Sequence, residues 1–158
     1  MMDEEIIRLA LRVTARTSLI FFLGAFAGAA LAVQWPGGFT TWLARRRRTW
    51  LVALAASHTV HLAAIGALGA VTNGKAWKDA GISSALGGGV AYLLIYVMAL
   101  RPGRDRLNSI GMYWVWAIFF ISYASRAAVE SFSYLPLVLL LAAALALRVL
   151  GRPPRGNV

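Results

Sequence analysis

The chain has 158 residues, of which 59% are hydrophobic and only 14% are charged. A soluble domain of this size typically has about 25% charged residues, and the charges here form clusters between long uncharged runs. Cysteine is absent, which excludes a disulfide framework, a thiolate metal site and a cysteine nucleophile. The net charge of +10 is better explained by basic residues at the ends of membrane helices than by nucleic-acid binding. We therefore expect a membrane protein with no nucleic-acid partner.

Five apolar segments are long enough, or nearly so, to cross a bilayer, which takes about 20 residues in a helix. We predict a single all-α domain over residues 1–158, an integral membrane bundle of about five transmembrane helices surrounded by lipid. The predicted helices span about 13–35, 50–71, 82–100, 109–129 and 132–150. The stretch 6–16 is amphipathic and basic, and we expect it to lie along the membrane interface ahead of the first span.

Turn-forming residues separate the predicted helices. The breaks are Pro36-Gly37-Gly38, Thr72-Asn73-Gly74, Arg101-Pro102-Gly103 and, at the end, Gly151 with Pro153-Pro154. The fourth and fifth helices meet at 130–134 with little room for a loop. This spacing predicts a tight helical hairpin or a pair of helices kinked near Pro136.

Three groups of basic residues predict the orientation. They are Arg45 to Arg48, then Arg101, Arg104 and Arg106, and finally Arg148, Arg152 and Arg155. In a five-helix chain all three groups lie on one side of the membrane, which the positive-inside rule assigns to the cytoplasm. We therefore predict that the N-terminus is outside and the C-terminus is cytoplasmic.

Small residues in the first predicted helix favour close helix packing. Gly24 and Gly28 form a G-x-x-x-G step, which lets two helices approach closely. The partner would be another helix of the same chain, another membrane subunit or a second copy.

The fourth predicted helix carries an aromatic band at 113–120. This band would pack against other helices, contact lipid or form the wall of a haem site. Arg126 in the same helix is spaced to pair with Glu130.

The main chemical signal is the sequence Ser57-His58-Thr59-Val60-His61, which holds the only two histidines of the chain. They follow the arginine group by 10 and 13 residues, which places them roughly 15–20 Å into the membrane, near its middle. Ionisable residues at that depth are costly and usually functional. Residues three apart share a helix face. The two histidines would bind a cofactor or metal, or would hydrogen-bond to neighbouring helices as neutral imidazoles.

Haem iron is the metal that the composition favours. A zinc or di-iron site would need further His, Cys or carboxylate ligands, and the nearest acid, Glu130, is expected on the far side. Haem needs only one or two axial ligands. His58 and His61 are therefore candidate axial ligands of haem iron. Because they share one helix face, each would need a partner elsewhere, and Met98, Met112 and the tyrosines are the candidates within the chain.

These motifs resemble a known family. Arg47-Arg48, followed by an apolar helix with Ser57-His58-x-x-His61, is similar to the second helix of the ferric-reductase-like transmembrane domain family. Thr14-Ala15-Arg16 and Leu107-Asn108-Ser109-Ile110-Gly111-Met112-Tyr113 resemble small bacterial members. The family includes ferric reductases, NADPH oxidases and the haem membrane subunit of the periplasmic methionine sulfoxide reductase system. The resemblance implies haem b bound in the bundle, electron transfer within or across the membrane, and a place in the bacterial inner (plasma) membrane.

The chain also departs from this family. Members usually have a histidine where this sequence has Asn108, and asparagine is a poor ligand of haem iron. No flavin- or nicotinamide-binding motif is present, so electrons would come from quinol or from a separate protein, and the chain would be a subunit of a membrane oxidoreductase. The alternative is a non-catalytic scaffold or accessory subunit of a larger membrane complex, without haem. A third reading is a small-solute carrier or channel, and the lack of intramembrane charges argues against ion transport.

Overall fold

The computed structural model describes residues 3–101 and 105–151, except for the side chains of Asp79, Ala80, Ser83, Ser84 and Asp105. Every regular element in these residues is a helix, so the all-α prediction is confirmed. In chain order the elements are α1 (Glu4–Gln34), α2 (Gly38–Arg45), α3 (Arg47–Val71), α4 (Lys75–Leu100), α5 (Asp105–Val129), the 3-10 helix η1 (Phe132–Tyr134) and α6 (Leu135–Leu150).

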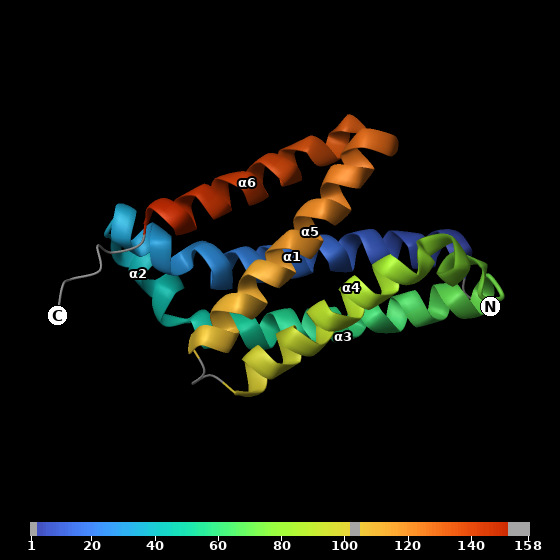
Figure 1. Cartoon of the computed structure of the whole chain (residues 1–158), viewed down its shortest axis with the longest axis horizontal. Coiled ribbons are helices and arrows are strands. Elements are labelled where there is room, and N and C mark those ends of the chain that lie inside the picture. Colours follow the sequence, from blue (N-terminus) through green and yellow to red (C-terminus); the bar gives the residue numbers. More distant parts are fainter. Residues whose placement is uncertain (1–2, 102–104, 152–158) are drawn as a thin grey trace.

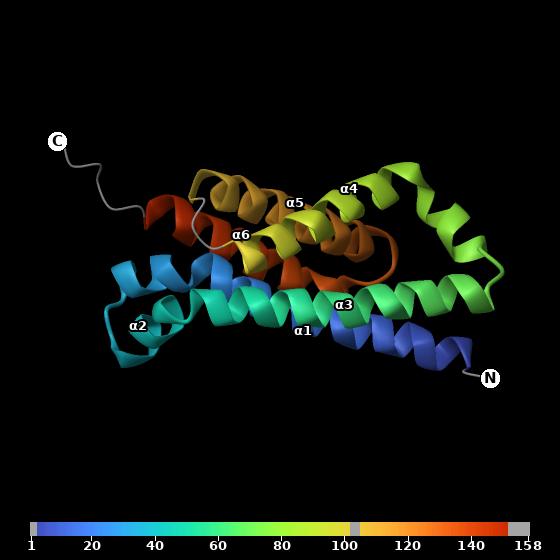
Figure 2. The ribbon, with the colours of Figure 1, turned by 90° about the horizontal axis from the view of Figure 1, so that it is seen from below.

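The long helices run alternately up and down one bundle, as Figures 1 and 2 show. Within the described residues, four helices are long and apolar enough to cross a membrane, namely α1, α3, α5 and the stretch Phe132–Leu150. Helix α4 contains a shorter apolar part, Ala85–Leu100. Because α3 ends at one end of the bundle and α5 begins at the other, α4 carries the chain back between them (Figure 1). The chain is therefore a multi-pass membrane protein.

Helices suit a lipid environment because each backbone N–H and C=O is paired within its own segment. The outward faces carry large apolar side chains that water would disfavour. Exposed examples are Ile20, Val52, Val60, Leu62, Leu93, Ile121, Leu139, Leu140 and Val149. The interior is built mainly on Phe22, Phe26, Leu54, Ile95, Met98, Met112, Val115 and Leu141, which are almost fully buried.

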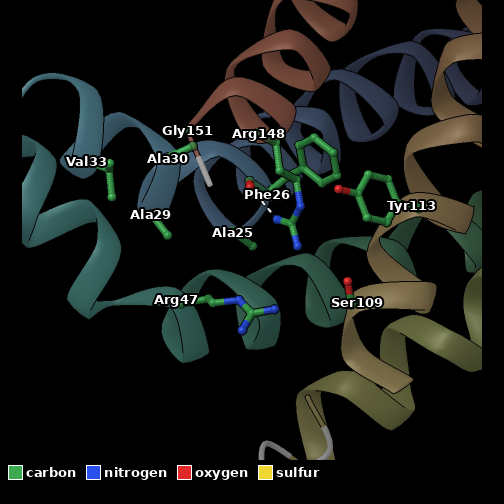
Figure 3. A pocket seen from close by; sticks show the side chains of 10 residues that line it. All are labelled: Ala25, Phe26, Ala29, Ala30, Val33, Arg47, Ser109, Tyr113, Arg148 and Gly151. Carbon is green, nitrogen blue, oxygen red and sulfur yellow. Dashed lines mark hydrogen bonds between the residues drawn. The ribbon is translucent and has the colours of Figure 1, made fainter. Parts of the chain in front are cut away.

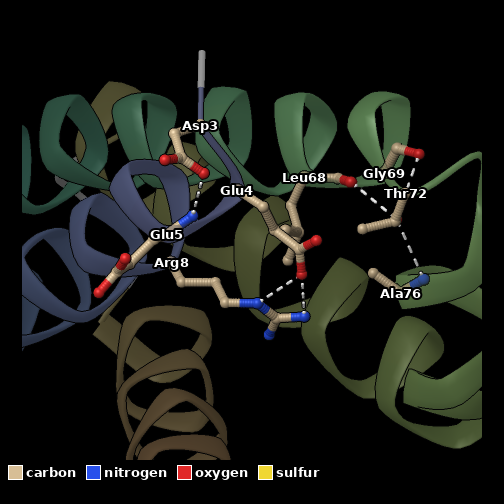
Figure 4. Close-up of polar contacts among 8 residues, drawn as sticks. All are labelled: Asp3, Glu4, Glu5, Arg8, Leu68, Gly69, Thr72 and Ala76. Atoms are coloured by element: carbon tan, nitrogen blue, oxygen red, sulfur yellow. Dashed lines mark hydrogen bonds and ion pairs between the residues drawn. The ribbon is translucent and has the colours of Figure 1, made fainter.

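The prediction for the start of the first helix was wrong. Helix α1 begins at Glu4, and the stretch 6–16 is its continuous first part and not a separate interfacial segment. The reason is that residues 3–8 form an N-cap and a first-turn ion pair. The carboxylate of Asp3 accepts a hydrogen bond from the backbone N–H of Glu5 at 3.4 Å, and Arg8 pairs with Glu4 one turn later at 2.7 Å (Figure 4).

Helix α2 is a second element that the sequence did not predict. It occupies most of the linker between the first two spans. The Thr40 hydroxyl donates to the Trp35 carbonyl at 2.7 Å and stabilises the turn before it. Leu43 is buried, and an added Cβ on Gly28 would lie 3.2 Å from its side chain. The short helix is therefore held against α1 by close packing.

A kink divides α4 where the third predicted helix begins. Gly81 has φ 74° and ψ 159°, which is not helical, and its positive φ is a conformation that glycine adopts at little cost. The predicted boundary near residue 82 is therefore confirmed as a break. The turn before α4 is closed by Thr72, whose hydroxyl donates to the Leu68 carbonyl at 2.8 Å and accepts from the Ala76 N–H at 3.3 Å (Figure 4).

The predicted hairpin between the last two helices is confirmed. Ser131 accepts a hydrogen bond from the Ser133 N–H at 3.1 Å, which stabilises η1. Pro136 lies in the first turn of α6, where its missing N–H breaks no helical hydrogen bond. The predicted break at 102–103 and the proline pair at 153–154 lie outside the described residues. The Gly151 N–H bonds to the Leu147 carbonyl at 2.7 Å and ends α6.

The G-x-x-x-G step packs within the chain. A Cβ on Gly24 would lie 2.8 Å from the Trp50 indole of α3. The partner at this face is therefore another helix of the same chain. Helix α6 closes the bundle by packing on α1, since the Arg148 guanidinium donates to the Phe26 carbonyl at 2.6 Å.

The described members of the three predicted basic groups lie at one end of the bundle, whereas other basic residues, among them Arg8, Lys75, Lys78 and Arg126, lie at the other end. Arg45 to Arg48 lie at the junction of α2 and α3, Arg101 ends α4, Arg106 is near the start of α5 and Arg148 is in the last turn of α6. The acidic residues Asp3, Glu4 and Glu130 lie at the other end. Arg104, Arg152 and Arg155 lie outside the described residues.

Candidate functional site

Two hydrogen-bonded pairs join α1 to α3. The Thr14 hydroxyl lies 2.8 Å from Nδ1 of His61, and the Ser18 hydroxyl lies 2.8 Å from the Ser57 hydroxyl. Each pair is one helical turn from the other on both helices, which places all four side chains along one antiparallel contact. The sequence predicts a role for the two histidines but not for Thr14 and Ser18. The signal for these two residues is that polar residues recur four positions apart on both helices, at 14 and 18 and at 57 and 61.

The Thr14 hydroxyl contacts both His61 and the backbone of its own helix. Its oxygen lies 2.7 Å from the Ala10 carbonyl, to which it can donate its single proton. The tautomer of His61 with its proton on Nδ1 satisfies both contacts, because Nδ1–H can then donate to the Thr14 oxygen, and in that tautomer Nε2 has a lone pair. A histidine that binds a metal almost always has its other nitrogen held by such a hydrogen bond.

His58 is more enclosed than His61. It is 8% exposed, and its ring centroid lies 4.9 Å from that of Tyr92 and 5.7 Å from that of Phe119. Its Nδ1 is buried and has no hydrogen-bond partner among the described residues. The two imidazole rings lie 6.0 Å apart. His58 therefore packs as a core aromatic ring beside His61.

Both histidines line one cavity of about 210 Å³ between α1, α3, α4 and α5. Its lining residues are Ala15, His58, His61, Ile65, Gly88, Ala91, Tyr92, Val115, Ile118, Phe119, Ser122, Tyr123 and Arg126. Along α3, His58 and His61 lie about 17 and 21 Å from the first residue of the helix. The cavity thus extends from mid-membrane toward Arg126, near the acidic end of the bundle.

Two tyrosines of this cavity carry polar atoms without partners. The hydroxyls of Tyr92 and Tyr123 are buried and make no hydrogen bond to any described residue. A buried polar atom left unpaired costs about 1–3 kcal/mol. Because no hydrogen bond holds either ring, each can rotate without breaking one. Gly88 adds open space, since a Cβ built there meets no atom within 4 Å.

The other candidate ligands lie elsewhere. Met98 and Met112 are fully buried and do not line the cavity; the sulfur of Met98 packs at Gly111. Asn108, which stands where the family usually has histidine, is also buried away from this cavity, and its Oδ1 has no partner among the described residues. Only Tyr92 and Tyr123 remain in place to face the histidines.

One charged residue, Arg126, is among the described residues that line the cavity. Its guanidinium lies 4.0 Å from the Glu130 carboxylate, which confirms the pairing predicted from the spacing. The described part of the chain holds no group of three His, Cys, Asp or Glu side chains that could surround a metal ion. Ligation here would therefore depend on the imidazoles of His58 and His61.

The lining of the cavity suits haem, but its volume does not. An imidazole, aromatic walls and a cation at the edge are features of haem sites. The volume is restrictive, because pockets for drug-sized ligands measure about 300–1,000 Å³. The cavity would therefore have to widen to hold a haem.

Comparison with protein-family models, with curated proteins and with solved structures gives no match to this chain.

Proposed function

We propose that this chain is a haem-b-binding membrane subunit that relays electrons, with His61 as the axial ligand. The observation that supports the proposal is the Thr14–His61 hydrogen bond at 2.8 Å. In the tautomer with the proton on Nδ1, this bond would hold the ring while Nε2 keeps its lone pair for iron. The resemblance to ferric-reductase-like proteins supports the same reading. The proposal places the chain in the bacterial inner membrane with its basic end in the cytoplasm.

Each residue of the cavity has a defined part in this proposal. His61 would hold the iron, Thr14 would orient His61, and the enclosed His58 and Phe119 would wall the macrocycle. Arg126, at the rim, would pair with a propionate carboxylate. Haem b, when bound, supplies a one-electron couple. The chain's own contribution is to keep water away from that couple and to hold its charge at a fixed depth.

An absorption spectrum of the protein purified in mild detergent tests the proposal. Addition of dithionite should produce the sharp α and Soret bands of a reduced b-type haem. His61→Ala should remove these bands, whereas His58→Phe, which keeps a packed ring, should retain them. A correctly inserted wild-type protein with no haem band, even after reconstitution with hemin, would reject the proposal.

The second candidate is an accessory subunit without haem. The small volume of the cavity and the packing of His58 as an enclosed core ring favour this reading. Such a subunit would dock other membrane proteins through its apolar faces. It predicts that His61→Ala lowers stability but leaves the assembly of its complex intact.

A further inference from the structure

Helix α2 lies across the end of the bundle that carries the three basic groups, with its axis transverse to the long helices (Figures 1 and 2). Its buried side chain, Leu43, packs at Gly28 of α1, and the Trp50 indole N–H of α3 donates to the Leu43 carbonyl at 3.2 Å. Because the long helices cross the membrane, a helix transverse to them at their end runs along the membrane surface. The fold thus places α2 at the depth of the lipid headgroups.

The outward side of α2 and of the turn before it is aromatic. Trp35, Phe39 and Trp42 are 59%, 70% and 41% exposed. The Phe39 and Trp42 rings stack with their centroids 5.9 Å apart, and the Arg46 guanidinium lies 5.2 Å from the centroid of the same Trp42 ring. Exposed rings of this size are unfavourable in water, whereas tryptophan is favoured at the boundary between headgroups and acyl chains. These rings therefore suit contact with lipid.

The junction between α2 and α3 is strongly basic. Arg45, Arg46 and Arg48 are exposed, whereas Arg47 extends into a cavity between α1, α3, α5 and α6 (Figure 3). No acidic residue occurs between positions 6 and 78, and no ion pair joins the three exposed arginines to a described carboxylate. Like charges this close in sequence repel each other, so an anion bound at this surface would be stabilising.

The start of α3 adds to the preference for an anion. A helix begins with unpaired backbone N–H groups and a partial positive charge. The first turn of α3 has no acidic residue, and no side chain caps it at Arg46. Helix α1 shows the opposite arrangement, with Asp3 as its cap and Glu4 and Glu5 in its first turn. An unneutralised helix end and three exposed arginines thus lie at the same place.

We infer that α2 is an interfacial helix that binds the phosphates of anionic phospholipids through Arg45, Arg46 and Arg48, with Phe39 and Trp42 among the headgroups. A lipid satisfies the charges and the exposed rings together, whereas a soluble anion would satisfy only the charges. Arginine can donate two parallel N–H···O bonds to a phosphate, and basic segments next to membrane spans attract anionic lipids. This surface is separate from the histidine cavity and does not depend on the function proposed for it.

Lipid binding to the purified full chain, measured by native mass spectrometry, tests the inference. The wild-type protein should retain phosphatidylglycerol at least about tenfold more tightly than phosphatidylcholine, since each arginine near an anionic surface contributes a factor of about 5. The double variant R45Q/R48Q should lose most of this preference. The matched control is R101Q/R106Q, which removes two exposed arginines at the same end of the bundle but from α4 and α5, and it should keep most of the preference.

A second measurement tests the depth of α2 with its arginines intact. In phosphatidylglycerol vesicles, a nitroxide on Phe39→Cys should be partly shielded from a water-soluble nickel relaxation agent. The same label on Asn73→Cys, in an exposed turn at the other end, should be more accessible. Equal accessibility of the two labels overturns the inference. So does a wild-type lipid preference in R45Q/R48Q, or an equal loss in R101Q/R106Q, which would show a general effect of positive charge.

Discussion

Thr14 and His61 lie 2.8 Å apart, oxygen to Nδ1, across the contact between α1 and α3. The Ser18–Ser57 pair one turn away repeats the relationship. Together they fix the register of the two helices, and the first of them also holds the more accessible imidazole in place. A structural contact and a candidate ligand therefore depend on the same threonine hydroxyl.

Removal of the Thr14 hydroxyl should show how much it contributes to helix packing and how much to holding His61. Thr14→Val keeps the side-chain shape but leaves Nδ1–H of His61 without an acceptor. Interhelical hydrogen bonds in membranes contribute about 0.6 kcal/mol on average and up to about 1.7, so we expect a loss of stability in that range in thermal or SDS unfolding. If haem is bound, the α band should also shift or weaken.

Thr17→Val is the matched control for Thr14→Val. The Thr17 hydroxyl also donates one turn back, to the Val13 carbonyl at 3.0 Å, but no hydrogen bond joins it to another helix among the described residues. Its substitution should be nearly neutral. Equal losses in both variants would show that the His61 contact contributes nothing.

Removal of a tyrosine hydroxyl in the histidine cavity should raise the stability of the protein, whereas removal of the Thr14 hydroxyl should lower it. Tyr92→Phe and Tyr123→Phe remove hydroxyls that have no partner, so each should stabilise the ligand-free protein by up to about 1–3 kcal/mol. Tyr96→Phe removes a hydroxyl that lies 2.9 Å from the Thr59 hydroxyl and should destabilise it. Thermal unfolding in one detergent compares all three, and destabilisation by Tyr92→Phe would indicate a partner for its hydroxyl.

Two glycines of α3 should differ sharply although they are one turn apart. A Cβ on Gly69 would clash with the Trp77 indole, whereas a Cβ on Gly66 meets no atom within 4 Å. Gly66→Ala should therefore be neutral or stabilise the helix by up to about 1 kcal/mol. Gly69→Ala should destabilise the turn between α3 and α4 by about 1–3 kcal/mol. Thermal midpoints of the two variants measure the difference.

The topology can be tested with single cysteines, because the chain has none of its own. Phe39→Cys lies at the basic end, and Asn73→Cys and Ser131→Cys lie in exposed turns at the other end. In sealed right-side-out vesicles a membrane-impermeant maleimide should label positions 73 and 131 but not 39. Inverted vesicles should give the reverse, and labelling of all three positions on one side would contradict the five-pass bundle.

The spans could be predicted from the sequence because each is a continuous apolar run that ends at glycine, proline or charge. The start of α1 and all of α2 could not. Residues 6–16 carry charges that made them resemble an interfacial segment, and α2 depends on Leu43 packing against Gly28. Both depend on a cap or a contact that local composition does not reveal.

Only part of the candidate site could be predicted from the sequence, because the rest depends on contacts between helices. His58 and His61 were identified because ionisable residues are rare in these spans. Their acceptor, Thr14, lies on another helix, and the pairing of helices is a tertiary property.

Helix lengths in this bundle are unequal, and the inequality determines how it matches its membrane. The 31 residues of α1 extend about 46 Å, whereas the 16 residues of α6 extend about 24 Å. A hydrocarbon layer is about 30 Å thick, so α1 has helix to spare and α6 has none. The apolar part of α4, Ala85–Leu100, is equally short. In lipids with longer acyl chains the bilayer would have to thin around these two helices, which makes them the part of the bundle that sets the preferred acyl-chain length.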